Sequence, residues 1–418
     1  MRSTNPHQAR RSARYILSAL SAATVTCALL GAAGLTASSA ASAASIPQPG
    51  RGAALRTSLR EDISQYLATR GTAEHISAVS LRVTFPGRAP GIDLAVGTNQ
   101  YGGGSPVSTS DLWPIGSNTK AFTTVILLQL EAEGKLSIND ALGKWLPQYP
   151  AWRSITIKRL LNMTSGIANY ANQPAFVATI AAGLSTDFSA AQLVSYAAGV
   201  PLGPAGYSYS DTNYILAQMI IERVTHDSYT DQLTKRIIIP LRLRTLCYAP
   251  YTCPAADAAR MATGYFFMPE VPSLLGQPVP PLALTWAQGA GGIVSSLHDL
   301  TTWDRALYQG RELPPRQQRQ LESLVSEATG KPIRTTTPTG PAGYGLGVQQ
   351  GTSQQLGTEW EYIGGTLGYR VDLAYFPRSG IIIAVGVNSA TDLDNEALGA
   401  LEASVYQSLQ NAGAAHAG

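Results

Sequence analysis

The pattern of apolar and polar positions is most informative around residues 122–130. There the sequence is "FTTVILLQL", and a helix with this sequence would be apolar on nearly every face. Such a helix is buried, and Gly134 is a natural residue to end it. The turn residues Pro114 and Gly116 precede it. The pattern therefore predicts a loop that leads into a buried helix.

The rest of the chain alternates between two periodicities. Period-two alternation predicts strands within 78–85, 92–96, 344–349, 360–376 and 381–388. Helical spacing predicts helices within 57–69, 136–146, 155–161, 170–200, 214–224, 226–246, 297–307 and 393–409. Strands near both ends with helices between them predict an α/β (α+β) protein. Its sheet subdomain would span about 56–110 and 288–410, and its mainly helical insertion about 111–287.

The first residues have the features of a signal peptide. Four arginines precede an apolar or small-residue stretch at 15–35, and Ala41-Ser42-Ala43 is a small-x-small cleavage site. We expect cleavage after Ala43, a flexible linker over 44–55, one hydrolase domain over 56–418, and no stable membrane anchor. An uncleaved anchor is the alternative, and the pair Arg10-Arg11 leaves the Sec and twin-arginine routes both open. The expected location is secreted or periplasmic, outside the cytoplasm.

Charge and cysteine content narrow the possible partners. The 418-residue chain has a net charge of +3, but removal of residues 1–43 takes away four arginines and no acids and leaves −1. Nucleic-acid binding is therefore not expected. Cys247 and Cys253 remain, and in an exported protein they can close a short disulfide loop. Free buried thiols are the alternative.

Ser117 and Lys120 are the candidate reactive pair. Ser117 stands at the expected helix start, and Lys120 lies one turn later on the same face. Burial disfavours the charged form of a lysine, and a neutral amine can accept the proton of a neighbouring hydroxyl. Ser117 can therefore be a nucleophile without a histidine. The pair can also be an ordinary N-cap and a surface lysine.

Several motifs in order resemble the serine β-lactamase and penicillin-binding protein family. The first is Ser117-Asn118-Thr119-Lys120, followed by "LLQLEAEGKLSINDALGKWLP" and "ITIKRLLNMTSGI". The later ones are "YSYSDTNYILAQMIIERVT", "WAQGAGGIVSSLHDL", "GYGLGV" and "GGTLGY". They cover about residues 58–408 and are most similar to the class C β-lactamase branch, with its D-alanyl-D-alanine carboxypeptidases and esterases. The resemblance implies a β-lactamase-like fold, with an antiparallel sheet from both termini flanked by helices.

The resemblance also implies roles for individual residues. Ser117 would be the nucleophile, and Tyr209 would work with Lys120 as general acid and base. The backbone N–H groups of Ser117 and Gly365 would form the oxyanion hole. Substrate-binding positions would be Asp211, Tyr362, Gly364 and Gly365. Tyr209 could instead be a core tyrosine with a satisfied hydroxyl.

Two motifs depart from the family pattern. Asp211 stands where the family usually has asparagine, and an ionised carboxylate offers only acceptors, so it should hold Lys120 and repel a substrate carbonyl. Tyr362-Ile363-Gly364 replaces the usual cationic and hydroxyl-bearing triplet, and Gln349 stands where some peptidases carry arginine. A substrate carboxylate is therefore expected to bind poorly. Aromatic residues at this position are typical of family esterases.

These features predict an exported serine hydrolase that acts through an acyl-enzyme and needs no cofactor or metal. Small esters or amides are the expected substrates. The alternatives are a D-alanyl-D-alanine carboxypeptidase or β-lactamase acting on peptidoglycan-like molecules, and a non-hydrolytic binding module. Position 119 is threonine, so there is no Gly-x-Ser-x-Gly elbow, and no His, Cys or Asp cluster has zinc spacing.

Overall fold

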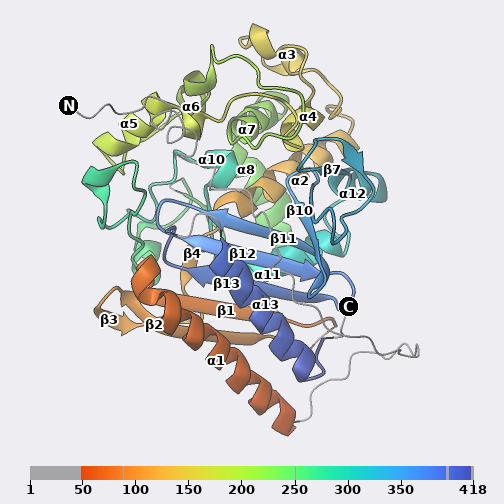
Figure 1. Cartoon of the computed structure of the whole chain (residues 1–418). Helices are drawn as coiled ribbons and strands as arrows, with labels where there is room; N and C mark the ends of the chain where they lie inside the picture. Colours follow the sequence, from red (N-terminus) through yellow and green to blue (C-terminus); the bar gives the residue numbers. More distant parts are fainter. Residues whose placement is uncertain (1–48, 88, 250, 392–394, 416–418) are drawn as a thin grey trace, which may run out of the picture.

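A ten-stranded antiparallel sheet forms the centre of the protein. The computed structural model describes residues 49–87, 89–249, 251–391 and 395–415. The strand order is β3-β2-β1-β13-β12-β11-β10-β9-β7-β8, so N-terminal and C-terminal strands pair directly (Figure 1). The strands are β1 (Ala78–Thr84), β2 (Ile92–Gln100), β3 (Gly103–Pro106), β7 (Leu324–Ser326), β8 (Pro332–Ile333), β9 (Ala342–Tyr344), β10 (Gln349–Ser353), β11 (Gly357–Gly365), β12 (Arg370–Phe376) and β13 (Ile381–Val387).

Two helices from opposite ends of the chain cover one face of this sheet. They are α1 (Pro49–Glu74) and α13 (Glu396–Asn411), which lie side by side across β1, β13 and β12 in Figure 1. Leu59 and Ile63 of α1 are fully buried there, as the predicted helical stripe requires. The prediction of a linker over 44–55 is wrong for residues 49–55, which belong to α1. Leu55 extends the apolar stripe by one turn, and a proline is tolerated in the first turn of a helix.

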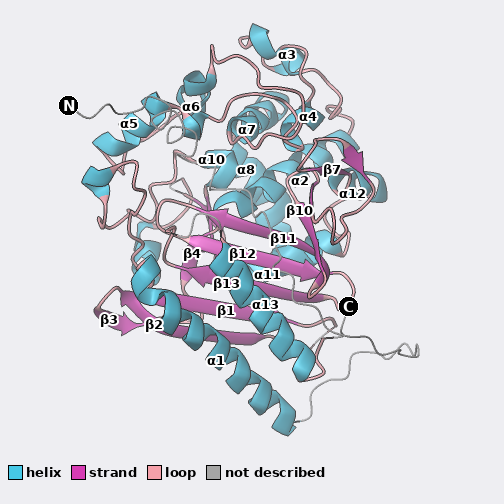
Figure 2. Ribbon diagram, viewed as in Figure 1, coloured by secondary structure: helices cyan, strands magenta, loops and turns pink. Residues whose placement is uncertain are grey.

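The opposite face packs against α11 (Leu297–Tyr308) and a mainly helical region (Figure 2). This region contains α2 (Thr119–Ala132), α3 (Leu142–Trp145), α4 (Ile157–Leu161), α5 (Pro174–Ala182), α6 (Ala190–Ala197), α7 (Thr212–Thr225), α8 (Tyr229–Leu233), α9 (Ile239–Leu241), α10 (Gln288–Gly291) and α12 (Pro315–Leu321). A second sheet, in the order β4-β6-β5, joins β4 (Leu112–Pro114), β6 (Ile293–Ser296) and β5 (Cys247–Tyr248). Two helices of this region, α10 and α12, lie beyond residue 287, where the predicted helical insertion ends.

The structure resolves two further predictions. Cys247 and Cys253 form a disulfide, which confirms the predicted bridge. Among the described helices none is long and apolar enough to cross a membrane. The predicted signal peptide, residues 1–43, lies outside the described residues.

Candidate active site

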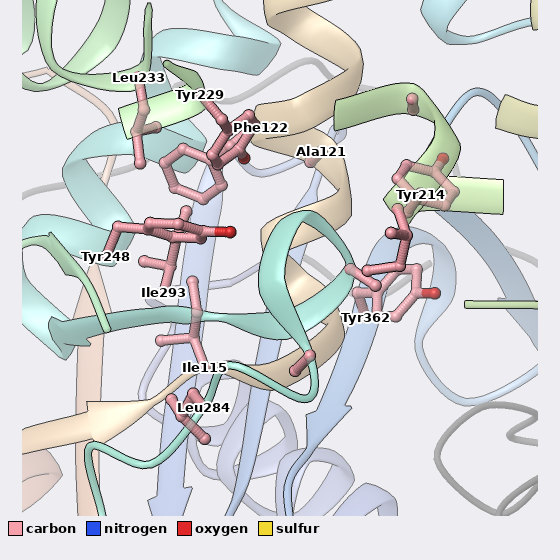
Figure 3. Packing of buried hydrophobic residues seen from close by; sticks show 14 of the residues in the cluster. Ile115, Ala121, Phe122, Tyr214, Tyr229, Leu233, Tyr248, Leu284, Ile293 and Tyr362 are labelled. Atoms are coloured by element: carbon pink, nitrogen blue, oxygen red, sulfur yellow. The ribbon is translucent and has the colours of Figure 1, made fainter. Parts of the chain in front are cut away.

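The predicted reactive pair sits where a loop tightens into the central buried helix. A 3₁₀ turn, η3 (Gly116–Asn118), follows β4 and leads directly into α2. Gly116 has a φ of 52°, a conformation that favours glycine. Figure 3 shows Phe122 packed with Tyr229 and Tyr248 on one side of α2, while Tyr214 and Tyr362 lie on the other. Because α2 is packed on all sides, the side chains at its N-terminal end are held in fixed positions.

Four predicted side chains meet around the hydroxyl of Ser117. The Nζ atom of Lys120 donates to Ser117 Oγ at 2.9 Å, and the hydroxyl of Tyr209 lies 2.8 Å from the same Oγ. Nζ also donates to Asp211 Oδ1 at 2.7 Å and to the carbonyl oxygen of Ala290 at 2.8 Å. Tyr209 and Asp211 come from the end of the loop before α7, and Ala290 comes from α10. The fold therefore joins three distant segments around the amine of Lys120.

The amine of Lys120 is completely buried, and this changes its acid–base behaviour. Desolvation lowers the pKa of Lys120, and the charge and hydrogen bond of Asp211 oppose that shift. A neutral amine can donate to Asp211 and Ala290 and accept from Ser117 with its lone pair. An ammonium group can donate to all three. Both protonation states of Lys120 thus satisfy their hydrogen bonds in the same geometry.

A chain of phenols extends from Tyr209. The hydroxyl of Tyr362 donates to Tyr209 at 3.4 Å and lies 3.1 Å from the hydroxyl of Tyr344. Burial, reinforced by the neighbouring phenols, raises the pKa of Tyr362 well above its ordinary value. Tyr362 therefore stays protonated and can keep donating to Tyr209. Ile363, the next residue of β11, points to the opposite face and packs under α1 and α13.

The end of β11 lies directly against the turn that carries Ser117. A Cβ atom added to Gly364 would lie 2.8 Å from the backbone N of Ser117 and 2.0 Å from the carbonyl oxygen of Ile115. A Cβ atom added to Gly116 would lie 2.6 Å from the backbone N of Gly365. Only glycine fits these positions without a shift of the backbone. The two backbone N–H groups that were predicted to form an oxyanion hole thus come from segments in close contact.

Asp211 is positioned mainly by partners inside the protein. Its Oδ1 accepts from Lys120, and its Oδ2 accepts from Asn169 Nδ2 at 3.2 Å. The side chain of Asp211 is only 6% exposed. These contacts agree with the expectation that Asp211 holds Lys120, whereas direct contact with substrate stays a prediction.

Sequence reasoning missed three groups of this site. Asn169 acts through Asp211, Ala290 acts through its backbone carbonyl, and Tyr344 acts through Tyr362. A backbone carbonyl has no signature in residue type. Asn169 follows the motif "ITIKRLLNMTSGI" and Tyr344 lies within "GYGLGV", and these positions were the available signal.

Comparisons with known proteins place the chain in one family. The sequence model of the Beta-lactamase family matches residues 19–407. Penicillin-binding protein 4* of Bacillus subtilis (strain 168) is 28% identical over 284 residues, which are 63% of this chain and 58% of that protein. The putative penicillin-binding protein PbpX of the same organism is 26% identical over 301 residues, 71% of this chain and 66% of its own length. This chain thus spans less than two thirds of either relative.

Solved structures resemble the chain over more of its length. A D-stereospecific amidohydrolase from Streptomyces sp. superposes with a TM-score of 0.68 and 26% identity, covering 83% of this chain and 96% of that one. D-amino acid amidase from Ochrobactrum anthropi SV3, complexed with L-phenylalanine amide, gives a TM-score of 0.71 at 21% identity, with 86% and 99% covered. The second likeness concerns the fold alone.

Proposed function

The chain belongs to the beta-lactamase family, and from this premise we propose that it is a serine hydrolase that forms an acyl-enzyme on Ser117. The predicted family and its β-lactamase-like fold are thereby confirmed. One observation carries the proposed activity. Two proton-exchanging groups, Lys120 Nζ and the Tyr209 hydroxyl, lie within 2.9 Å of one serine oxygen, and the amine is buried. That is the geometry a serine nucleophile needs.

Acylation requires one proton to leave Ser117 and one to reach the leaving group. The neutral amine of Lys120 accepts the proton of Ser117 as Oγ attacks the carbonyl carbon. The carboxylate of Asp211 then stabilises the ammonium group that forms. Tyr209 donates its hydroxyl proton to the leaving group, and proton transfer between Lys120 and Tyr209 restores both. Water attacks the ester of Ser117 in the second half of the reaction, with the same groups in reverse roles.

The negative charge of the tetrahedral intermediate falls on the former carbonyl oxygen. In this proposal the backbone N–H groups of Ser117 and Gly365 donate to that oxygen. Each such donor is worth roughly 3–4 kcal/mol in other serine hydrolases. The oxyanion hole is made of backbone groups, so the departures from the family pattern at Asp211 and at Tyr362-Ile363 leave it intact.

The proposed substrates are small esters or amides without a carboxylate near the scissile bond. Tyr362 supplies a neutral phenol where the family pattern has a cation, and Ile363 turns toward the opposite face. The D-stereospecific amidohydrolase among the structural neighbours supports amides beside esters. A D,D-carboxypeptidase or β-lactamase activity is the second candidate, favoured by the penicillin-binding relatives.

We also propose that residues 1–43 direct export and are removed. The Cys247–Cys253 disulfide supports this, because disulfides persist in oxidising compartments. The N-terminal sequence of the protein recovered from the culture medium or periplasm tests it. An N-terminus at Ala44 is expected, and retention of residue 1 in the cytoplasm would refute it.

A labelling experiment with a substrate panel tests the activity. We expect a fluorophosphonate to label the wild type and not Ser117→Ala. Ser210→Ala is the matched control, because Ser210 is fully buried next to Tyr209 and its hydroxyl has no hydrogen-bond partner among the residues that the structure describes. Turnover of p-nitrophenyl butyrate or an amino acid amide without nitrocefin turnover is expected. Release of D-alanine from a D-Ala-D-Ala peptide would favour the second candidate, and a folded protein that is never labelled would be a binding module.

A further inference from the structure

Four carboxylates gather on the back of β11, away from Ser117. Strand residues alternate between the two faces of a sheet, so Glu359 and Glu361 of β11 face α1 and α13 while Tyr362 faces the active site. Asp372 of β12 lies on the same back face, since it pairs with Ile363 in the sheet register. Glu402 projects from α13 onto this group. Oxygen atoms of Glu361, Asp372 and Glu402 all lie within 4.8 Å of one another.

These carboxylates are buried without partners that could neutralise them. Asp372 and Glu402 are each 1% exposed, and Glu359 is 4% exposed. Both carboxylate oxygens of Asp372 and Oε1 of Glu402 have no hydrogen-bond partner in the described part of the chain. Within residues 49–87, 89–249, 251–391 and 395–415, no ion pair joins any of the four to a lysine, arginine or histidine. Buried charge of one sign is strongly unfavourable unless the carboxylates bind a counter-charge or protons, and the hydrogen bond between Glu359 and Glu402 needs a proton when no cation is bound.

We propose that Glu361, Asp372 and Glu402 bind one hard divalent cation, with Glu359 beside it. Carboxylate oxygens are the ligands that Ca²⁺, Mg²⁺ and Mn²⁺ prefer. Oxygens on opposite sides of one Ca²⁺, each about 2.4 Å from the ion, are about 4.8 Å apart, so the observed spacing admits Ca²⁺ with little movement. Glu361 is the least buried of the four residues. The proposal departs from the sequence-based expectation of no metal site, which considered only ligands at zinc spacing.

A cation here would act as a clamp at the back of the active site. It would join β11 and β12 to α13, through three elements that come together only in the folded protein. The same strand carries Tyr362 and Gly364 on its other face, two residues that pack against Tyr209 and Ser117. The cation is thus a structural element that fixes this strand and takes no part in the reaction.

Calcium binding to the full-length protein tests the proposal. Protein treated with EDTA and dialysed should bind one Ca²⁺ in isothermal titration calorimetry. Its Tm should rise by about 3 °C at a Ca²⁺ concentration about 100-fold above Kd. Asp372→Asn and Glu402→Gln should each lose the heat of binding and most of the Tm shift. Neither readout depends on hydrolysis, so the result stands whatever the substrate of Ser117.

A matched variant separates this site from buried acids in general. Asp304 of α11 is 4% exposed, its Oδ2 has no hydrogen-bond partner in the described part of the chain, and α11 packs on the other face of the sheet. Asp304→Asn should bind Ca²⁺ like the wild type. If Asp372→Asn fails to fold, Tb³⁺ luminescence of the wild type, displaced by Ca²⁺, gives the same information. Absence of Ca²⁺, Mg²⁺, Mn²⁺ and Tb³⁺ binding, or Ca²⁺ binding that survives both substitutions, would overturn the proposal.

Discussion

The two faces of the β11–β12 hairpin differ in whether the buried charged groups beside them have a partner of opposite charge. On the front, the buried Lys120 is paired with Asp211 at 2.7 Å, and both groups have further hydrogen bonds. On the back, Glu359, Asp372 and Glu402 lie together with no described counter-charge. The front is complete with protein groups alone, whereas the back is complete only with a bound cation or shared protons. Tyr362 and Glu361, which are neighbours on β11, thus face two different electrostatic environments.

Removal of the positive charge of Lys120 should leave the front with an unpaired buried carboxylate, as on the back. Lys120→Met leaves Asp211 buried without its partner, so the free energy of unfolding should fall by roughly 3–5 kcal/mol. Ester hydrolysis should fall by about 10²–10⁴-fold, because the general base is lost. Urea denaturation and p-nitrophenyl butyrate kinetics measure the two effects.

A double variant separates the loss of stability from the loss of hydrolysis. Lys120→Met combined with Asp211→Asn removes both charges, so most of the stability should return while hydrolysis stays lost. Full activity of either variant would contradict the role given to the lysine. Equal instability of the single and double variants would contradict the charge-pair argument.

The pH dependence of stability distinguishes the back from the front. Burial raises the pKa of Glu361 to about 7 and that of Glu359 to about 8, and burial with neighbouring carboxylates raises the pKa values of Asp372 and Glu402 well above their ordinary range. Folded protein then holds protons that the unfolded chain has released. Without a cation, stability should therefore be highest below the ordinary carboxyl pKa of about 4, fall as pH rises from there through about 7 to 8, and level off above those values.

Saturating Ca²⁺ should reduce that fall, since the cation replaces the protons. The other titratable groups near the cluster are Glu327, which follows β7, and Tyr406 of α13. Asp304, whose pKa burial raises to about 8, titrates in the same direction with or without Ca²⁺, so the difference between the two curves isolates the cluster. Thermal unfolding in EDTA and in Ca²⁺ from pH 5 to pH 9 measures it. Coincident curves would mean that the carboxylates keep shared protons.

Loss of the disulfide should not directly change the charged groups on either face of the β11–β12 hairpin. Cys247→Ser with Cys253→Ser opens a loop with a sequence separation of 6, for which the chain-entropy estimate is about 2 kcal/mol of stability. The Ca²⁺-dependent difference in the pH curves should remain. A change in that difference would show that β5 and the back of β11 are energetically coupled.

The smallest expected effect is a shift in the pH profile of hydrolysis by the active site. Asp211 raises the pKa of Lys120 against the larger lowering by burial, so Asp211→Asn should lower that pKa further. The acid limb of the profile of kcat/KM should then move to lower pH, because the neutral amine persists there. Acylation by a fluorescent penicillin should also increase, since asparagine restores a donor for the substrate carbonyl. An unchanged profile with weaker labelling would refute the account of this position.

Local patterns predicted the front of the hairpin better than the back. The spacing of Ser117 and Lys120 before an apolar run placed both at the start of a buried helix, and the resemblance added Tyr209 and Gly365. The sheet from both termini followed from strand alternation near both ends. These features depend on nearest neighbours along a helix or strand, which a sequence records directly.

The back of the hairpin depends on pairings that a single sequence does not record. Glu361, Asp372 and Glu402 meet only after β11, β12 and α13 have packed, and each taken alone has the pattern of a solvated strand or helix residue. The start of α1 was missed for a similar reason. Leu55 is buried by α13 and the sheet, and this burial overrides the loop preference of the Pro-, Gly- and Ala-rich residues around it.

The most direct test of the central claim is the site of acylation. Wild-type protein incubated with p-nitrophenyl butyrate or an amino acid amide, quenched with acid and digested, would be analysed by mass spectrometry. We predict an acyl group on the peptide that contains Ser117, and on Ser117 itself by fragmentation, with none in Ser117→Ala. Hydrolysis accompanied by an acyl group on another residue, or hydrolysis that persists in Ser117→Ala, would contradict the account.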